Sequence, residues 1–453
     1  MTARALPVIQ RAPDSGSCCA ACAAESTPVR RPRSRADDRR ITFAGLTVSA
    51  AILSVALASV ALPETVRRGL WLPLHLGLAG AAGTAVASVL PFFTTALAVA
   101  PPAGRAVRIM AIAFVALGSL TVSAGVVRGV PAVAVAGGLA YLCGLGALAV
   151  AAFGTLPGSL GPKRLLLRVA YGAAVAQVAV GVVTATAMLA GFTPIVDRWD
   201  LLKPAHAWLN VFGFLSVIVA TTLVHLAPTV AGTRIRARPS ATVAVVGLVV
   251  GAPVVAIGLA LGDDTVVRIG ALVEVMGAGA LVAHGIAVQR GHARWTTDPG
   301  WHRLTSWSLL AGPIWLLVAT AIGGGRLIWL GANPAAWSLG DVAAPLAIGW
   351  VAQVLVGAWS HLLPAIGPGD PPAHARARDI LGRGASARVV ALNLGVAFLV
   401  AGGPLAWSPA IAIGLAFAIG GSMASVVIFL LAGADRRSDA LVPSPASSYG
   451  MKP

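Results

Sequence analysis

The sequence predicts an all-α membrane protein with about twelve transmembrane helices. Of its 453 residues, 57% are apolar and only 11% are charged, whereas a soluble domain is about 45–50% apolar and about 25% charged. Hydrophobic segments of roughly 20 to 28 residues follow one another, each long enough to cross about 30 Å of hydrocarbon as a helix. Short segments of Gly, Pro and Arg separate them. The composition therefore excludes an ordinary globular enzyme and a disordered regulator.

The expected spans make up one transmembrane helical domain, residues 41–432. In order they cover residues 41–62, 69–99, 106–128, 130–153, 165–190, 203–231, 240–262, 265–288, 302–323, 340–366, 385–403 and 408–432. No soluble domain fits in the residues that remain, so the function must be carried by the membrane-embedded part.

The distribution of Arg and Lys predicts the orientation. They gather in the connections after even-numbered spans: Arg105, Arg108, Lys163, Arg164, Arg168, Arg234, Arg236, Arg238, Arg290, Arg294, Arg303, Arg376, Arg378, Arg383 and Arg388. The other connections carry far fewer. Cytoplasmic loops are enriched in Lys and Arg, so we expect a multi-pass protein of the cell membrane with both termini in the cytoplasm. The net charge of +17 then reflects topology and contact with the lipid bilayer, and indicates no nucleic acid partner.

The two ends of the chain read as disordered cytoplasmic tails, residues 1–40 and 433–453. The first is rich in Arg and contains Cys18, Cys19 and Cys22 in the pattern Cys-Cys-x-x-Cys. The cytosol is reducing, which leaves a thiolate site for Cu(I) or Zn²⁺, a redox couple, or no function for these residues. No second Cys or His pair lies nearby to complete a tetrahedral zinc site.

Three even-numbered spans end on a similar motif, which predicts an internal repeat. The motifs are Ser88-Val89-Leu90-Pro91, His225-Leu226-Ala227-Pro228 and His361-Leu362-Leu363-Pro364. The prolines are 137 and 136 residues apart, with four spans to each interval. The period predicts three pseudo-repeats of four helices, over residues 41–153, 165–288 and 302–432. The alternative is chance, because Leu-Pro at a helix end is common in such proteins.

Five of the eight histidines lie within or at the ends of spans. Polar groups inside a membrane are costly unless they are paired or functional, so these histidines are the candidate site residues. His75 and His206 lie near the outer ends of spans two and six. Imidazoles on facing helices can hold a haem iron axially or bind copper. The alternative is that each ring hydrogen-bonds a carbonyl or a water close to the membrane surface.

A second layer of histidines lies near the inner ends of the spans. His225 and His361 occupy matching positions of the expected repeat, where we expect haem or copper binding, and His284 on span eight is a further candidate metal ligand. His206 and His225 are 19 residues apart on one helix, about 28 Å at 1.5 Å per residue, so the two layers cannot share a metal. The remaining three, His292, His302 and His374, are expected to be solvated.

Glu274 is the carboxylate that the sequence places well inside a span, on the helix that carries His284. A buried carboxylate can relay protons. It can instead form an ion pair with Arg268, six residues earlier. Both interpretations remain open at this point.

Span six resembles a known family. It reads His206-Ala-Trp-Leu-Asn-Val-Phe-Gly-Phe-Leu and, further on, His225-Leu-Ala-Pro-Thr-Val-Ala-Gly. This resembles the NnrS family of haem- and copper-containing membrane proteins, in which a His opens a similar Phe-Gly-Phe helix that ends at Pro and Gly. Twelve spans in three units of four are also similar to subunit I of the haem-copper oxidases. His75-Leu-Gly-Leu-Ala-Gly and the run from Gln353 to Pro364 are similar to the membrane portion of some actinobacterial copper-oxidase-like chains.

The sequence departs from the oxidases at their metal ligands. Those enzymes hold low-spin haem between histidines of spans two and ten, and His75 matches the first while His361 lies at the other membrane face. Span seven has no His for the oxidase copper, and span six has no Tyr. The resemblance therefore implies haem or copper binding on this scaffold, with a role in redox chemistry, nitric-oxide stress or copper handling, and no proton-pumping oxygen reduction.

Two other functions stay open. Repeats are typical of cofactor-free permeases, and Gly251-Ala252-Pro253 in span seven and Gly312-Pro313 in span nine are candidate helix breaks for one. Alternatively, the protein anchors or serves a separately encoded copper protein. Whether it is an enzyme is left open by the sequence.

Overall fold

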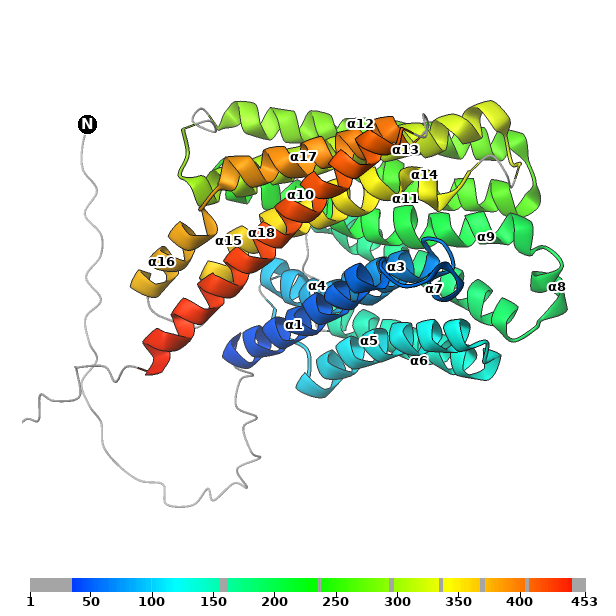
Figure 1. Ribbon diagram of the computed structural model, residues 1–453, viewed down its shortest axis with the longest axis horizontal. Coiled ribbons are helices and arrows are strands. Elements are labelled where there is room, and N and C mark those ends of the chain that lie inside the picture. The colour runs from blue at the N-terminus through cyan, green and yellow to red at the C-terminus, as the bar shows by residue number, and fades with distance from the viewer. Residues whose placement is uncertain are drawn as a thin grey trace, which may run out of the picture.

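The computed structural model describes residues 35–98, 100–154, 162–234, 236, 238–292, 297–333, 337–366, 371–403 and 407–441. Within these residues, twelve helices are long and apolar enough to cross a membrane, as the sequence predicts. The protein is therefore an all-α, multi-pass membrane protein. Its long helices run side by side in a bundle (Figure 1), with the short helix α8 (Thr193–Val196) at one end and α16 (Pro371–Leu381) at the other.

The spans have the following bounds. The first four are α1 (Arg35–Ser59), α3 with η1 and α4 (Trp71–Leu74, His75–Ala82, Gly83–Ala98), α5 (Arg105–Arg128) and α6 (Pro131–Phe153), and α2 (Glu64–Arg67) precedes α3. The next four are α7 (Pro162–Leu189), α9 with η2 and α10 (Trp199–Trp208, Leu209–Ser216, Val217–Val230), α11 (Pro239–Leu261) and α12 (Asp264–Gly291). The last four are α13 (Gly300–Leu330), α14 with η4 and α15 (Leu339–Ala343, Ala344–Ala352, Gln353–Ile366), α17 (Ala385–Gly402) and α18 (Ser408–Leu441).

Several helices extend beyond the expected spans. The first begins at Arg35, α13 continues to Leu330 instead of 323, and α18 continues to Leu441. Residues 433–441, expected to be disordered, are thus helical. Hydropathy marks where contact with hydrocarbon ends, whereas a helix continues through polar residues until Pro or Gly interrupts its hydrogen bonds.

Spans two, six and ten each contain a π-helical segment, η1, η2 and η4. Such segments make up well under 1% of protein residues and are frequent at functional sites. The prolines of the motif that recurs in the sequence lie within the α-helices that follow these segments. They are Pro91, Pro228 and Pro364. The π-helical segments therefore recur with the same period of four spans as the prolines.

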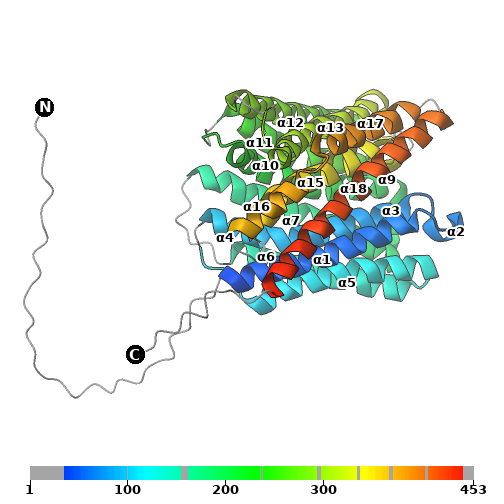
Figure 2. The same ribbon diagram turned by 60° about the vertical axis from the view of Figure 1, so that its left-hand side comes forward.

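The other feature with this period is a glycine-lined hairpin. Spans three and four, seven and eight, and eleven and twelve pack closely on each other (Figures 1 and 2). In each pair the glycines are spaced by seven residues within a helix and twelve across the turn: Gly118, Gly125, Gly137 and Gly144, then Gly251, Gly258, Gly270 and Gly277, then Gly395, Gly402, Gly414 and Gly421. A Cβ on Gly118 would lie 2.6 Å from Tyr141 N, one on Gly251 2.7 Å from Glu274 N, and one on Gly395 2.6 Å from Ala418 N. Backbones can approach this closely only without side chains between them.

Arg108 lies inside the bundle and not in a connection. It is 1% exposed, on the first turn of α5, and its guanidinium pairs with Asp38 of α1. It also donates to Thr42 Oγ1 at 2.9 Å and to the carbonyl of Ser88 at 2.7 Å. This residue, which the sequence groups with the loop charges, therefore links α1, α4 and α5.

Candidate functional site

His75 is held in one orientation by two neighbours. Its ring stacks on Trp71 with the centroids 4.8 Å apart and the planes at 19°. Its Nδ1 lies 3.1 Å from Oγ of Ser123 on α5, and that hydroxyl donates its proton to the carbonyl of Ser119 at 2.9 Å. A hydroxyl has only one proton to donate, so the Nδ1–H of His75 is the donor to Ser123. In the neutral ring, Nε2 then carries the lone pair that can bind a metal.

His206 has the same tautomer for a similar reason. Its Nδ1 lies 2.8 Å from the carbonyl oxygen of Gly181 on α7. A carbonyl only accepts, so Nδ1 carries the proton and Nε2 the lone pair. The amide nitrogen of Asn210, one turn later, lies 3.2 Å from Nε2 and donates to it. A metal bound at Nε2 therefore requires this amide to turn away.

The structure brings these two predicted residues within electrostatic reach of each other. His75 and His206, on spans two and six, lie close enough for a charge on one ring to act on the other. Each ring uses Nδ1–H for a bond to the protein. This anchoring fixes the tautomer and the ring orientation, and it is the arrangement seen in metal-ligating histidines.

The second histidine layer separates into two groups. His284 on α12 is 3% exposed, and its ring interacts with His225 of α10 and with the Val224 carbonyl, without a hydrogen bond of normal geometry at either nitrogen. His361 on α15 instead stacks against Trp301 at 6.4 Å and interacts electrostatically with His302. None of the described contacts of His361 involves His225. His225 and His361 therefore correspond only in the expected repeat, and no described contact joins them.

Glu274 is fully buried in α12. Arg268 pairs with Asp264 at 3.6 Å, and neither carboxylate oxygen of Glu274 makes a hydrogen bond of normal geometry within the described residues. Trp208, whose indole nitrogen is also buried without a hydrogen bond among the described residues, lies near the carboxylate. The ion pair between Glu274 and Arg268, one of the two interpretations of the sequence, is therefore wrong. Because an unpaired buried charge is costly, the site suits a carboxyl group that holds a proton.

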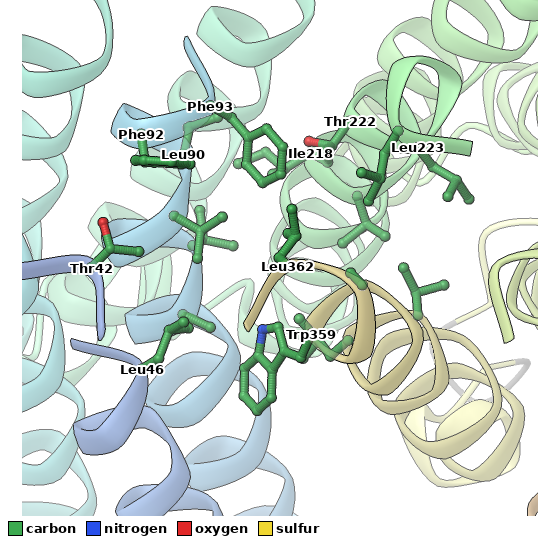
Figure 3. Close-up of a pocket in the computed structure, with 18 residues that line it drawn as sticks. Thr42, Leu46, Leu90, Phe92, Phe93, Ile218, Thr222, Leu223, Trp359 and Leu362 are labelled. Carbon is green, nitrogen blue, oxygen red and sulfur yellow. The ribbon is translucent and has the colours of Figure 1, made fainter. Parts of the chain in front are cut away.

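Helices α1, α4, α10 and α15 line a partly open cavity of about 90 Å³ (Figure 3). In Figure 3, Leu90 and Phe93 of α4, Leu223 of α10 and Leu362 of α15 lie around one space. The lining is almost entirely apolar, with Thr42 and Thr222 as polar side chains.

A polar cluster at the α16 end was missed by the sequence analysis. His292 at the end of α12 and His302 on α13 both contact Oδ2 of Asp298 at 2.6 Å, and none of the three is fully exposed. Burial acts to raise the pKa of Asp298, but the hydrogen bonds and charges of the two histidines outweigh it and hold that pKa below its usual range. The spacing of ten residues between the histidines, interrupted by a connection, has no recognisable motif.

The remaining candidate ligands, Cys18, Cys19 and Cys22, lie outside the described residues. Neither a protein-family model nor a curated protein matches this chain.

Proposed function

We propose that this membrane protein binds haem or copper through His75 and His206, and that it serves redox chemistry, nitric-oxide stress or copper handling. The observation that carries the proposal is the tautomer that the two rings share. Ser123 and Gly181 occupy the two Nδ1–H groups, which leaves the Nε2 lone pair of His75 for a metal, and that of His206 once the Asn210 amide turns away. Imidazole suits haem iron and copper alike. The resemblance of span six to the NnrS family supports the same cofactors.

The donor set fits such a group on chemical grounds. Two neutral imidazoles from different helices are donors that haem iron and copper both accept, so His75 and His206 would hold such a group. Bound there, the metal would supply one-electron redox chemistry. The protein's own contribution is to orient the rings through Ser123, Gly181 and Trp71, and to surround them with helices that limit access of water.

The three-unit repeat is part of this proposal. The glycine spacing, the π-helical segments and the prolines all recur every four spans, which supports units over residues 41–153, 165–288 and 302–432. The inner helices α4, α10 and α15 share the lining of one cavity, as a threefold arrangement requires. Under this arrangement His75 and His206 lie on equivalent helices. Glu274 and Tyr141 are also equivalent, because each faces the first glycine of its hairpin.

Glu274 has a role in this proposal as a proton carrier. It lies in the bundle without an ionic partner, close to Trp208, which is two residues from His206 on α9. A redox centre in a membrane needs a compensating proton when its charge changes. His225 with His284, and separately His361, provide further imidazoles for haem or copper toward the α16 end.

The test is spectroscopic. We expect the full-length protein, purified in detergent, to show a Soret band or to contain copper, and we expect His75→Ala and His206→Ala each to abolish that signal while His374→Ala preserves it. His374 is a suitable control because it lies on α16, at the other end of the bundle. A folded wild-type protein without haem or copper, or a signal unchanged in both variants, refutes the proposal. The first result would favour a cofactor-free permease, or a membrane anchor for a separately encoded copper protein.

A further inference from the structure

We propose that His292, Asp298 and His302 form a separate binding site for a divalent transition-metal ion of the Zn²⁺ type, at the α16 end of the bundle. The site joins α12 to α13 and shares no residue with the proposed haem or copper site. Two imidazoles and one carboxylate are a common protein ligand set for Zn²⁺.

The ligand atoms already lie at nearly the right separations. Nε2 of His292 and Nδ1 of His302 are each 2.6 Å from Oδ2 of Asp298, and all three atoms lie within 4.8 Å of one another. Ligands at about 2.0–2.1 Å from a tetrahedral Zn²⁺ are about 3.4 Å apart. Two of the separations are shorter than this value and the third is at most 4.8 Å, so small side-chain rotations bring the three atoms around one ion.

His302 has an outer partner of the kind that metal ligands use. Its Nε2 lies 2.6 Å from the carbonyl oxygen of Val230, at the end of α10. The carbonyl requires a proton on Nε2, which leaves Nδ1 as the ligand atom. The ring is held further by contact with Trp301, 5.4 Å between centroids. His302 is therefore oriented by α10 and by its own neighbour on α13.

The carboxylate is also held by its surroundings. Arg303 donates from Nη2 to the main-chain carbonyl of Asp298 at 3.1 Å and from Nη1 to Ser386 Oγ on α17 at 3.2 Å. The guanidinium thus fixes the backbone of Asp298 and leaves its carboxylate to the histidines. Fixing the chain before the ion binds reduces the entropy that binding costs.

The degree of enclosure suits an ion that keeps a water. The side chains of His292, Asp298 and His302 are 19%, 12% and 13% exposed. They are buried enough to be ordered, and one side stays open to solvent. Three protein ligands with a fourth open position are typical of zinc sites that exchange ligands, whereas closed structural sites have four protein ligands. The site therefore suits reversible binding of the ion.

The competing explanation is a hydrogen-bonded clamp with no ion, in which Asp298 ties α12 to α13. The experiment separates the two with full-length protein in which Cys18, Cys19 and Cys22 are replaced by Ser, so that the tail cannot bind the probe. The protein is stripped with a chelator and titrated with Co²⁺, whose visible absorption reports tetrahedral coordination, and then with Zn²⁺ as competitor.

We expect the protein with an intact site to bind one Co²⁺ that Zn²⁺ displaces. Asp298→Asn, His292→Ala and His302→Ala should each weaken binding by at least about 100-fold, the upper end of the loss for an outer partner alone. His374→Ala, the histidine control on α16, should bind as before. Asp298→Asn keeps the shape of the side chain, so this variant still distinguishes a metal site from a hydrogen-bonded clamp if His302→Ala fails to fold. Absence of Co²⁺ binding by the folded protein, or equal binding by Asp298→Asn, overturns the proposal and leaves the clamp.

Discussion

Individual polar residues inside this bundle fall into two kinds. Arg108 of α5 has an ion pair and a hydrogen bond to α1 and a hydrogen bond to α4, so its charge is compensated where it lies. Glu274 and His284 are as deeply buried, yet their polar atoms lack such partners. A buried polar group with hydrogen-bond or ionic partners stabilises or specifies the fold. A buried polar group without partners costs free energy, and such groups are concentrated at functional sites. This difference makes Glu274 and His284 the stronger functional candidates.

The role of Arg108 can be measured. Removing one partner of a buried ion pair leaves an unpaired charge, so Arg108→Met should destabilise the protein by about 3–5 kcal/mol. Replacing Asp38 by Leu as well should recover much of this loss, because no charge is then left unpaired. Thermal unfolding in detergent, followed by circular dichroism, compares the variants.

The matched control is Arg105→Met. Arg105 is exposed, one turn before Arg108 on α5, and its loss should change the melting temperature little. Equal melting temperatures for the Arg105 and Arg108 variants would mean that the buried ion pair does not hold α1, α4 and α5 together.

At the level of elements, two features recur every four spans. One is the π-helical segment, in which a wider turn changes the direction of the side chains that follow. In span two this segment begins at His75, and in span six it begins three residues after His206. The other is the hairpin whose helices touch along glycines. Without a hydrophobic force between helices in lipid, such close packing is the main source of their association.

The packing of the first hairpin predicts a contrast between two glycines of one helix. A Cβ on Gly137 would lie 2.5 Å from the backbone nitrogen of Val122, whereas one on Gly146 would have no neighbour within 4 Å. Gly137→Ala should therefore push α6 away from α5 and destabilise the protein by about 1–3 kcal/mol. Gly146→Ala should be neutral or stabilise it by up to about 1 kcal/mol, because Ala is the better helix former.

Both variants can be followed by the temperature at which the detergent-solubilised protein aggregates. A loss of stability in Gly146→Ala as large as that in Gly137→Ala would show that helix propensity, and not contact between α5 and α6, governs this hairpin.

At the level of the whole molecule, the orientation in the membrane stays a prediction from the positions of Arg and Lys. The structure places consecutive connections at alternate ends of the bundle, with α8 at one end and α16 at the other (Figure 1). If the basic residues lie in the cytoplasm, α16 is inside and α8 is outside.

Cysteine labelling of intact cells tests this orientation. In a protein with its four native cysteines replaced by Ser, Asp197→Cys beside α8 should react with a membrane-impermeant thiol reagent, and Ala375→Cys on α16 should react only after the cells are opened. Both positions are exposed, so access depends on the side of the membrane and not on burial. The reverse pattern would place both termini outside the cytoplasm.

The spans and the depth of each candidate residue could be predicted without a structure. Hydrocarbon thickness sets the length of a span, and each residue advances a helix by about 1.5 Å. The spacing of 19 residues between His206 and His225 was therefore enough to assign them to different layers. The glycine spacing was equally visible in the sequence, but its meaning depends on which helices form hairpins.

The neighbours of each residue could not be predicted in this way. Depth along the helix follows from residue number, whereas the direction of a side chain around the helix and the identity of the adjacent helix depend on how all twelve spans pack. His361 therefore meets Trp301 and not His225, and Arg268 pairs with Asp264 and not Glu274. Asp298 contacts both His292, at the end of α12, and His302, on α13. The pairs Arg268–Asp264 and His302–Asp298 are four residues apart, as the helical period allows. Contacts such as those of His361 with Trp301 and of His302 with Val230 join positions that no helical period relates, so only packing brings them together.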